Sequence, residues 1–169
     1  SMNAFTIAMN IPSKRCLADS SPLGKLIKDN LNFKKIIENP KLFFVNATDY
    51  TNRLPFTREV HGLNEEDLFK VVRGSSSPPI YFELVDFYGR LLGDAGIINN
   101  YAITQAIEAG CDTVYMLTPT KYPPKKIQTI LDVLSTTIDI ATQGYKRREI
   151  GCVEKMNEII DFVNVDLEP

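Results

Sequence analysis

The segment Gly93-Asp94-Ala95-Gly96 carries the residue types of this sequence that are best suited to chemistry. A carboxylate lies between two glycines, directly after an apolar run and before a helical pattern. Ligands of open α/β sheets bind at the carboxyl ends of the strands, and glycine allows a sharp turn and the close approach of a substrate. The segment therefore predicts either a carboxylate site at the rim of a sheet or an ordinary turn that contains aspartate.

Other reactive side chains are few and scattered. His61 is the only histidine, so a Ser-His-Asp triad or a multi-histidine zinc site would depend on that one residue. Cys16, Cys111 and Cys152 are too widely spaced to predict a disulfide framework or a CxxC metal knuckle, and they favour a reducing compartment. We expect no metal site and no organic cofactor.

The composition is that of one folded domain. The chain has 169 residues, 44% of them apolar and 24% charged, which predicts a packed core rather than disorder. A net charge of −2 without a concentrated basic face argues against a nucleic-acid partner. No apolar stretch reaches the roughly 18 residues that span a bilayer, and the start of the chain lacks a secretion signal. We expect a single domain over residues 1–169, with residues 1–2 a remnant ahead of it, in a cytoplasmic or peripheral membrane location.

Hydrophobic periodicity predicts helices that alternate with apolar strands. Helices are expected at 21–31, 33–37, 64–74, 103–110, from 125 to about 141 and from about 147 to 160, and strands at 41–49, 55–60, 80–85, 91–92, 113–117 and 163–167. Ser21 is the expected N-cap of the first helix and Asn64 that of the third, and Gly74 is the glycine expected to follow the third. The predicted fold class is α/β, with a mixed, mostly parallel sheet covered by helices.

Four stretches of the sequence carry a resemblance to a known family. They are Val45-Asn-Ala-Thr-Asp49, Val72-Arg-Gly-Ser-Ser-Ser-Pro-Pro79, Asp94-Ala-Gly96 with Asn100 after it, and Glu108-Ala-Gly-Cys-Asp-Thr-Val114. In this order and spacing they resemble the back half of a patatin-like phospholipase. That family shows an Ala-Thr-Asp strand, a V-x-A-S-x-A-x-P segment, an Asp-Gly-Gly or Asp-Gly-Ala motif followed by an asparagine, and a Gly-Ala-Asp-x-Val strand entry. The resemblance runs from about Ser20 to about Glu149.

The resemblance implies a role for each residue of the aspartate loop. Asp94 matches the base of the family's serine–aspartate dyad, which hydrolyses lipid ester bonds. Gly93, Ala95 and Gly96 would support the loop, and Asn100 would brace it. The substrate would be a phospholipid or acylglycerol, and peripheral contact with a membrane would accompany its hydrolysis.

The sequence also departs from the family pattern. No G-x-S-x-G pentapeptide is present to carry the nucleophilic serine, and the glycine-rich oxyanion loop is absent as well. Since loss of the nucleophile alone costs on the order of 10⁶ in kcat, the chain by itself is expected to be inactive. Ala95 replaces the second motif glycine, and Ala102 stands where the family usually has proline. A positive φ at position 95 would disfavour alanine.

Three interpretations remain open. The chain is the C-terminal portion of a patatin-like lipid acyl hydrolase, a non-catalytic α/β module that binds a lipid or a protein, or a small domain of another α/β family. The first implies an unpaired strand near 42–48 or 113–117, where the missing half of the sheet would continue. Because exposed strand edges pair with other chains, we expect self-association or association with the missing N-terminal half.

Overall fold

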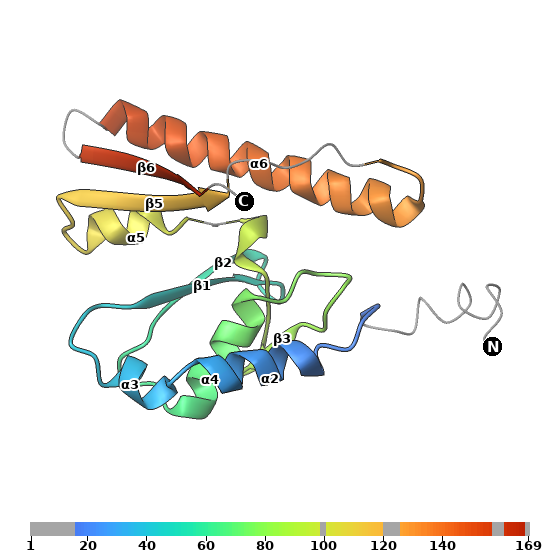
Figure 1. Cartoon of the computed structure of the whole chain (residues 1–169), viewed down its shortest axis with the longest axis horizontal. Helices are drawn as coiled ribbons and strands as arrows, with labels where there is room; N and C mark the ends of the chain where they lie inside the picture. The colour runs from blue at the N-terminus through green and yellow to red at the C-terminus, as the bar shows by residue number, and fades with distance from the viewer. Residues whose placement is uncertain (1–15, 99–100, 120–125, 157–160, 168–169) are drawn as a thin grey trace. The chain divides into compact units, whose positions relative to one another are not determined.

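The computed structural model describes residues 16–98, 101–119, 126–156 and 161–167 (Figure 1). The chain divides into two compact units, Ser1–Gly96 and Ile97–Pro169, and each is described by itself. The expectation of one domain over residues 1–169 stays a prediction.

The first unit is built on a four-stranded sheet of order β2-β1-β4-β3. Its strands are β1 (Phe44–Asp49), β2 (Leu54–Glu59), β3 (Val85–Phe87) and β4 (Arg90–Gly93). Every neighbouring pair in it is antiparallel, so the predicted mostly parallel sheet is wrong for this unit. The reason is the short connections: β1 joins β2, and β3 joins β4, through turns that are far too short for the crossover that parallel strands require.

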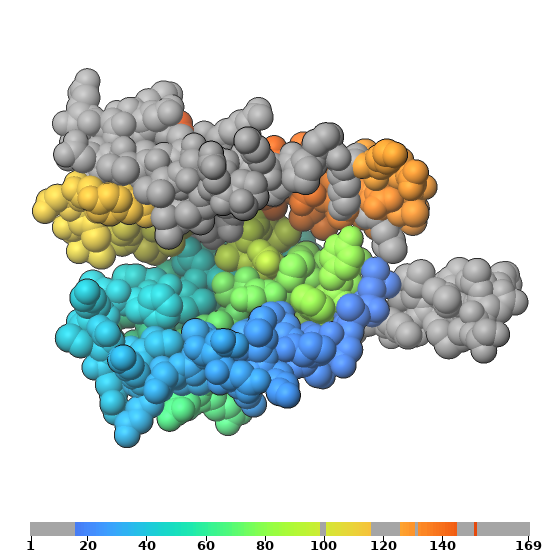
Figure 2. Space-filling view, in the orientation of Figure 1, coloured from blue at the N-terminus to red at the C-terminus, as the bar shows by residue number. Residues whose placement is uncertain are grey.

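The helices of this unit begin and end close to the predicted positions. They are α2 (Ser21–Asn30), α3 (Phe33–Ile37) and α4 (Glu65–Ser75). The side chain of Asn64 accepts a hydrogen bond from the N–H of Asp67, as the sequence predicts for an N-cap. The N-cap of α2 is Ser20 rather than Ser21. Figure 2 shows α2 and α3, coloured blue to cyan, spread over one face of the unit.

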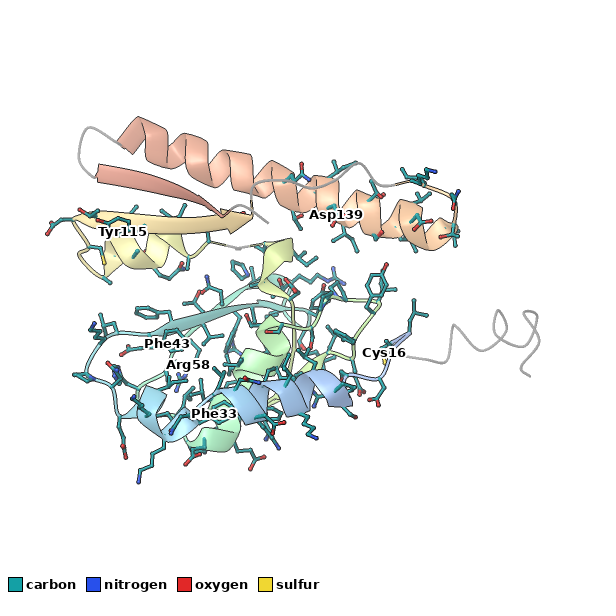
Figure 3. The ribbon with its side chains drawn as sticks, viewed as in Figure 1. Cys16, Phe33, Phe43, Arg58, Tyr115 and Asp139 are labelled. Carbon is teal, nitrogen blue, oxygen red and sulfur yellow. The ribbon has the colours of Figure 1, made fainter. Side chains whose placement is uncertain are left out.

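The core lies between α4 and the sheet. Leu68 and Val71 of α4 and Ala47 and Leu92 of the sheet are all completely buried. Burial of a large apolar side chain contributes about 1.5–3 kcal/mol, so this contact is the main source of stability of the unit. Phe33, labelled in Figure 3, lies in this unit. Its ring packs edge to face against that of Phe69, with the ring centroids 6.1 Å apart.

Gly74 has a different role from the predicted one. It does not follow α4 but lies inside it, buried against the sheet. A Cβ atom at this position would lie 2.8 Å from the Cβ of Leu92, closer than real contacts allow. The glycine therefore permits the close approach of helix and strand rather than a left-handed turn.

The second unit contains a parallel pair of strands joined by one long helix (Figure 1). Its elements are α5 (Ile103–Glu108), β5 (Thr113–Pro119), α6 (Ile130–Met156) and β6 (Asp161–Leu167). The two helices predicted over 125–160 are a single helix, because no proline interrupts it and the glycine at its centre costs only about 1 kcal/mol. On strand β5, Thr113 is exposed and Tyr115 is 70% exposed.

The expected unpaired strand is seen only in part. Strand β1 lies inside the sheet, with β2 along its whole length on one side. On the other side it pairs with β4 only at Thr48 and Asp49. Among the described residues, Phe44–Ala47 therefore have no strand partner on that side. In the second unit, β5 pairs with β6 alone within the part of the chain that the structure describes.

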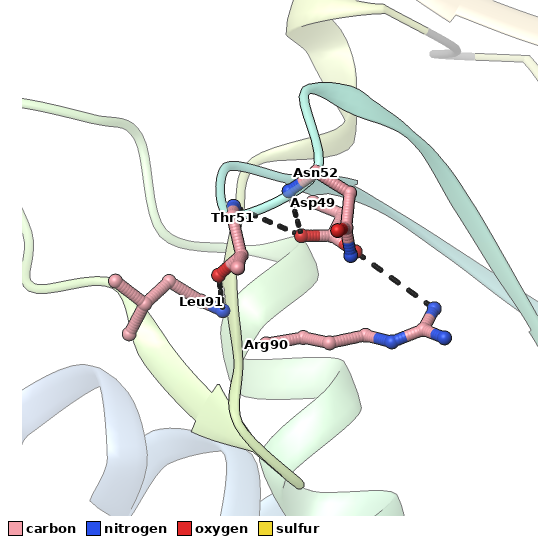
Figure 4. A network of polar contacts seen from close by, with 5 residues as sticks. All are labelled: Asp49, Thr51, Asn52, Arg90 and Leu91. Carbon is pink, nitrogen blue, oxygen red and sulfur yellow. Dashed lines mark hydrogen bonds and ion pairs between the residues drawn. The ribbon is translucent and has the colours of Figure 1, made fainter.

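Asp49, the last residue of β1, closes the turn that leads to β2 (Figure 4). Its carboxylate accepts hydrogen bonds from the N–H of Thr51 at 2.9 Å, the N–H of Asn52 at 3.0 Å and the side chain of Asn52 at 2.8 Å. The guanidinium of Arg90 lies 3.8 Å away. Burial opposes ionisation of this carboxyl group, but the hydrogen bonds outweigh it and hold the pKa of Asp49 below its ordinary value.

Replacing Asp49 by alanine should lower the free energy of unfolding at neutral pH by about 2–4 kcal/mol, because a buried acceptor of several hydrogen bonds is removed. Asp49→Asn keeps an acceptor for the two N–H groups and should cost less. Since the pKa is lowered on folding, the ionised group adds stability above its ordinary pKa of about 3.9, and this stability is lost as the pH falls through the lowered value. Urea denaturation in neutral and acid buffers measures both effects. Equal stability of the native protein and Asp49→Ala at neutral pH would contradict this account.

Candidate functional site

Asp94 lies where three segments of the first unit meet. It follows β4 directly and precedes a 3₁₀ turn, η2 (Ala95–Ile97). Its N–H donates to the carbonyl of Ser77 at 2.9 Å, beyond the end of α4. Its carbonyl accepts from the hydroxyl of Thr48 on β1 at 2.7 Å. The backbone of Asp94 is thus fixed from both sides by elements that are distant in sequence.

The carboxylate of Asp94 has only a small set of partners. One oxygen accepts from the N–H of Gly96 at 2.7 Å. Within the described residues, Asp94 forms no salt bridge. Burial raises the pKa of the Asp94 carboxyl above its ordinary value, and the N–H of Gly96 offsets part of that rise. A carboxyl group whose pKa is moved toward neutral is better suited to accept and return a proton.

The two residues that hold the backbone of Asp94 are themselves well anchored. Ser77 is completely buried, and its hydroxyl donates to the carbonyl of Arg73 at 2.7 Å. Serine side chains at helix ends commonly satisfy helix carbonyls in this way. Thr48 is 4% exposed. Its contact with Asp94 spans 46 positions of sequence, and only its place in the Ala-Thr-Asp stretch could have pointed to it.

Gly93 is required by close packing. A Cβ atom there would lie 2.7 Å from both Leu84 Cδ2 and Tyr50 Cε2. The residue is not among the glycines with positive φ. Its value to the loop is therefore the absence of a side chain rather than an unusual backbone conformation.

Gly93, Ala95 and Gly96 flank Asp94 in the chain, and their role as support of the loop stays a prediction. Ala95 is 8% exposed and is not among the described residues with positive φ, so alanine carries no backbone penalty there. Asn100 lies outside the described residues. Ala102 has φ of 52°, a conformation that proline cannot adopt, so the backbone at this position differs from one that carries the family's usual proline. The catalytic role of Asp94 itself stays a prediction.

His61 is engaged elsewhere. Its Nδ1 lies 2.9 Å from a carboxylate oxygen of Glu59, and its Nε2 lies 2.6 Å from the carbonyl of Asn39. Both ring nitrogens are thus used to tie two loops together. In the part of the chain that the structure describes, no cluster of three or more metal-ligating side chains is found. None of the described helices is long and apolar enough to cross a membrane.

Among the described residues of the first unit lie a hollow of about 670 Å³ and another of about 600 Å³. Both are lined by residues of α2 and α4, among them Lys28 and Phe69. Asp94 is not among the residues that line either of them. Its candidacy therefore rests on the geometry of its loop and on its carboxyl group rather than on these hollows.

Asp94→Asn should become more stable relative to the native protein as the pH rises from acid to neutral. A carboxyl whose pKa is raised by folding costs stability once it ionises, and this cost grows as the pH passes from about 3.9 through the raised value. Asparagine keeps the acceptor for Gly96 and carries no charge. Thermal unfolding over this pH range measures the difference, with Asp86→Asn, an exposed carboxyl on β3, as the matched control for loss of one charge. A difference that does not change with pH would contradict the burial of this group.

Comparison with known proteins identifies the family of the chain. The family model of patatin-like phospholipases, described as "Patatin-like phospholipase", matches residues 1–107. The match covers 107 of the 169 residues and includes Thr48, Ser77 and Asp94. It ends before the Glu108–Val114 stretch. No curated protein matches the chain. On this evidence the chain belongs to the patatin-like phospholipase family.

Proposed function

We propose that this chain is the C-terminal portion of a lipid acyl hydrolase domain and supplies the aspartate of a serine–aspartate dyad. Membership of the patatin-like phospholipase family supports lipid ester hydrolysis as the reaction class. The observation that carries the proposal is the setting of Asp94. Its backbone is held by Thr48 and Ser77, while its half-buried carboxylate is left with the N–H of Gly96. A purely structural aspartate, such as Asp49, has all its oxygens satisfied instead.

In the proposed reaction, a serine hydroxyl from the other half of the domain attacks the acyl carbonyl of the lipid. Asp94 takes the proton of that hydroxyl as the new bond to the carbonyl carbon forms. It then returns the proton to the alcohol oxygen of the leaving group as the ester bond breaks. Water, deprotonated by Asp94, attacks the acyl-enzyme, and the proton passes to the serine as the fatty acid leaves. Backbone N–H groups of the other half would stabilise the oxyanion.

The chain alone is proposed to be inactive. It contains no G-x-S-x-G pentapeptide, and the nucleophile accounts for about 10⁶ of the rate in serine hydrolases that use a comparable constellation. Gly93, Ala95, Gly96 and Asn100 are proposed to shape the loop without taking part in proton transfer. No cofactor or metal is needed for this chemistry.

A second candidate is a non-catalytic α/β module that keeps the architecture and binds a lipid or a protein partner. The absence of the serine motif from this sequence is the observation that favours it. The two candidates differ in the encoded sequence upstream of residue 3, which must carry a glycine-rich loop and a G-x-S-x-G segment if the first is correct. Under either, we propose a cytoplasmic or peripheral membrane location.

Asp94→Asn in the hydrolase that contains this chain should abolish release of fatty acid from a short-chain ester and from phospholipid vesicles. The loss expected for removal of a dyad base is on the order of 10⁴-fold or more in kcat/KM, with folding retained because asparagine has the same shape. Asp86→Asn serves as the control of equal charge change. Activity within tenfold of the native enzyme would reject Asp94 as the base.

The chain on its own should associate, with itself or with the missing N-terminal half. The reason is the stretch Phe44–Ala47 of β1, which has no strand partner on one side among the described residues. Size-exclusion chromatography with light scattering over a wide concentration range measures the mass. A monomer at all concentrations, with or without the N-terminal half added, would count against the proposal.

A further inference from the structure

Two residues at the end of β1 reach the segment that contains Asp94. Thr48 belongs to the strand, and Tyr50 lies in the turn that follows it. Thr48 reaches the carbonyl of Asp94. Tyr50 reaches Gly93, since its Cε2 and Cδ2 lie 2.7 and 3.3 Å from where a Cβ of Gly93 would stand.

Hydrogen bonds fix the backbone on both sides of Tyr50 and so limit the directions that its ring can take. The N–H of Tyr50 donates to the carbonyl of Leu91 at 2.8 Å. The next residue, Thr51, accepts from the N–H of Leu91 at 2.9 Å through its hydroxyl. Asp49 on the other side closes the turn through its three hydrogen bonds. The ring thus emerges from a fixed point beside Gly93, one residue from Asp94.

We propose that the aromatic ring of Tyr50 is a positioning element for the Asp94 carboxyl group: it lies over Gly93, forms one wall of the space around the carboxylate and excludes water from it. Leu84, which also contacts the side-chain space of Gly93, forms the neighbouring part of that wall. This inference rests on the proposed role of Asp94 as a general base and names a residue that tunes it. The ring acts, and the phenolic hydroxyl is dispensable.

Electrostatics in the structure agree with this placement. Burial raises the pKa of the Tyr50 phenol, and the negative charge of Asp94 adds to this rise, as expected for a ring that lies beside the neighbouring residue, Gly93. For Asp94, burial is the larger cause of its raised pKa, and the N–H of Gly96 opposes it. In the part of the chain that the structure describes, no charged side chain contributes to the pKa shift of Asp94. Water exclusion by apolar neighbours is therefore the property that a change at position 50 would alter.

The test is a titration of the Asp94 carboxyl carbon by ¹³C NMR in this chain. Tyr50→Ala should raise the acid dissociation constant of Asp94 at least ~3-fold, because the carboxylate gains water. Tyr50→Phe keeps the ring and should change that constant less than ~1.5-fold. Tyr88→Ala is the matched control, since Tyr88 is 77% exposed and its hydroxyl donates to Asp67. An unchanged constant in Tyr50→Ala overturns the proposal, and so does an equal rise in Tyr50→Phe, which would make the hydroxyl the active group.

A reciprocal measurement decides the matter if Tyr50→Ala does not fold. In Asp94→Asn, removal of the negative charge should raise the acid dissociation constant of the Tyr50 phenol, followed by NMR of labelled tyrosine and assigned through Tyr50→Phe. An unchanged Tyr50 titration overturns the proposal. These readouts need no nucleophile and so are independent of hydrolysis. In the active hydrolase, Tyr50→Ala should also move the acid limb of the kcat/KM profile to lower pH, with Tyr50→Phe unchanged. If Asp94→Asn retained hydrolysis while the titrations behaved as expected, the proposed function would fail and the contact of Tyr50 with Asp94 would stand.

Discussion

The hydrogen bond from the hydroxyl of Thr48 to the carbonyl of Asp94 is the interaction on which the candidate site depends. It joins the end of β1 to the residue that follows β4, at the point where the pairing of these two strands begins. The carbonyl of Ser77 holds the N–H of the same residue from the end of α4. Because the N–H and the carbonyl of Asp94 are both hydrogen-bonded, the carboxylate is not needed to anchor the backbone of this residue. This is the division of labour that a proton-transfer group requires.

Close packing around the site leaves no room for a side chain at two glycines. Gly74 allows α4 to approach Leu92 of β4, and Gly93 leaves room for Tyr50 and Leu84. In both places the missing side chain lets an element come closer than any other residue would allow. The carbonyl of Ser77 reaches Asp94 because α4, which ends just before it, is drawn tightly onto the sheet. The close packing of α4 and the geometry of the loop are thus consequences of the same contacts.

Asp49 and Asp94 are both removed from solvent, but folding shifts their pKa values in opposite directions. Asp49 is surrounded by donors from Thr51 and Asn52, its pKa is lowered, and it stabilises a turn. Asp94 is half-buried with few donors, and its pKa is raised. The second arrangement costs stability once the carboxyl group ionises, and carboxyl groups with a raised pKa are common at functional sites. The contrast favours a chemical role for Asp94 over a structural one.

Short-range patterns in the sequence were enough to predict most helices of the first unit and the candidate loop. Asn64 as a helix cap, the apolar run of β1 and the glycine-flanked Asp94 all follow from spacing and residue type. The antiparallel sheet of the first unit could be known from the fold alone, since strand order depends on which segments fold back on each other. The fold also places Gly74 inside α4 and brings Thr48 and Ser77 to the backbone of Asp94. These contacts join residues up to 46 positions apart, and no local pattern encodes such distances.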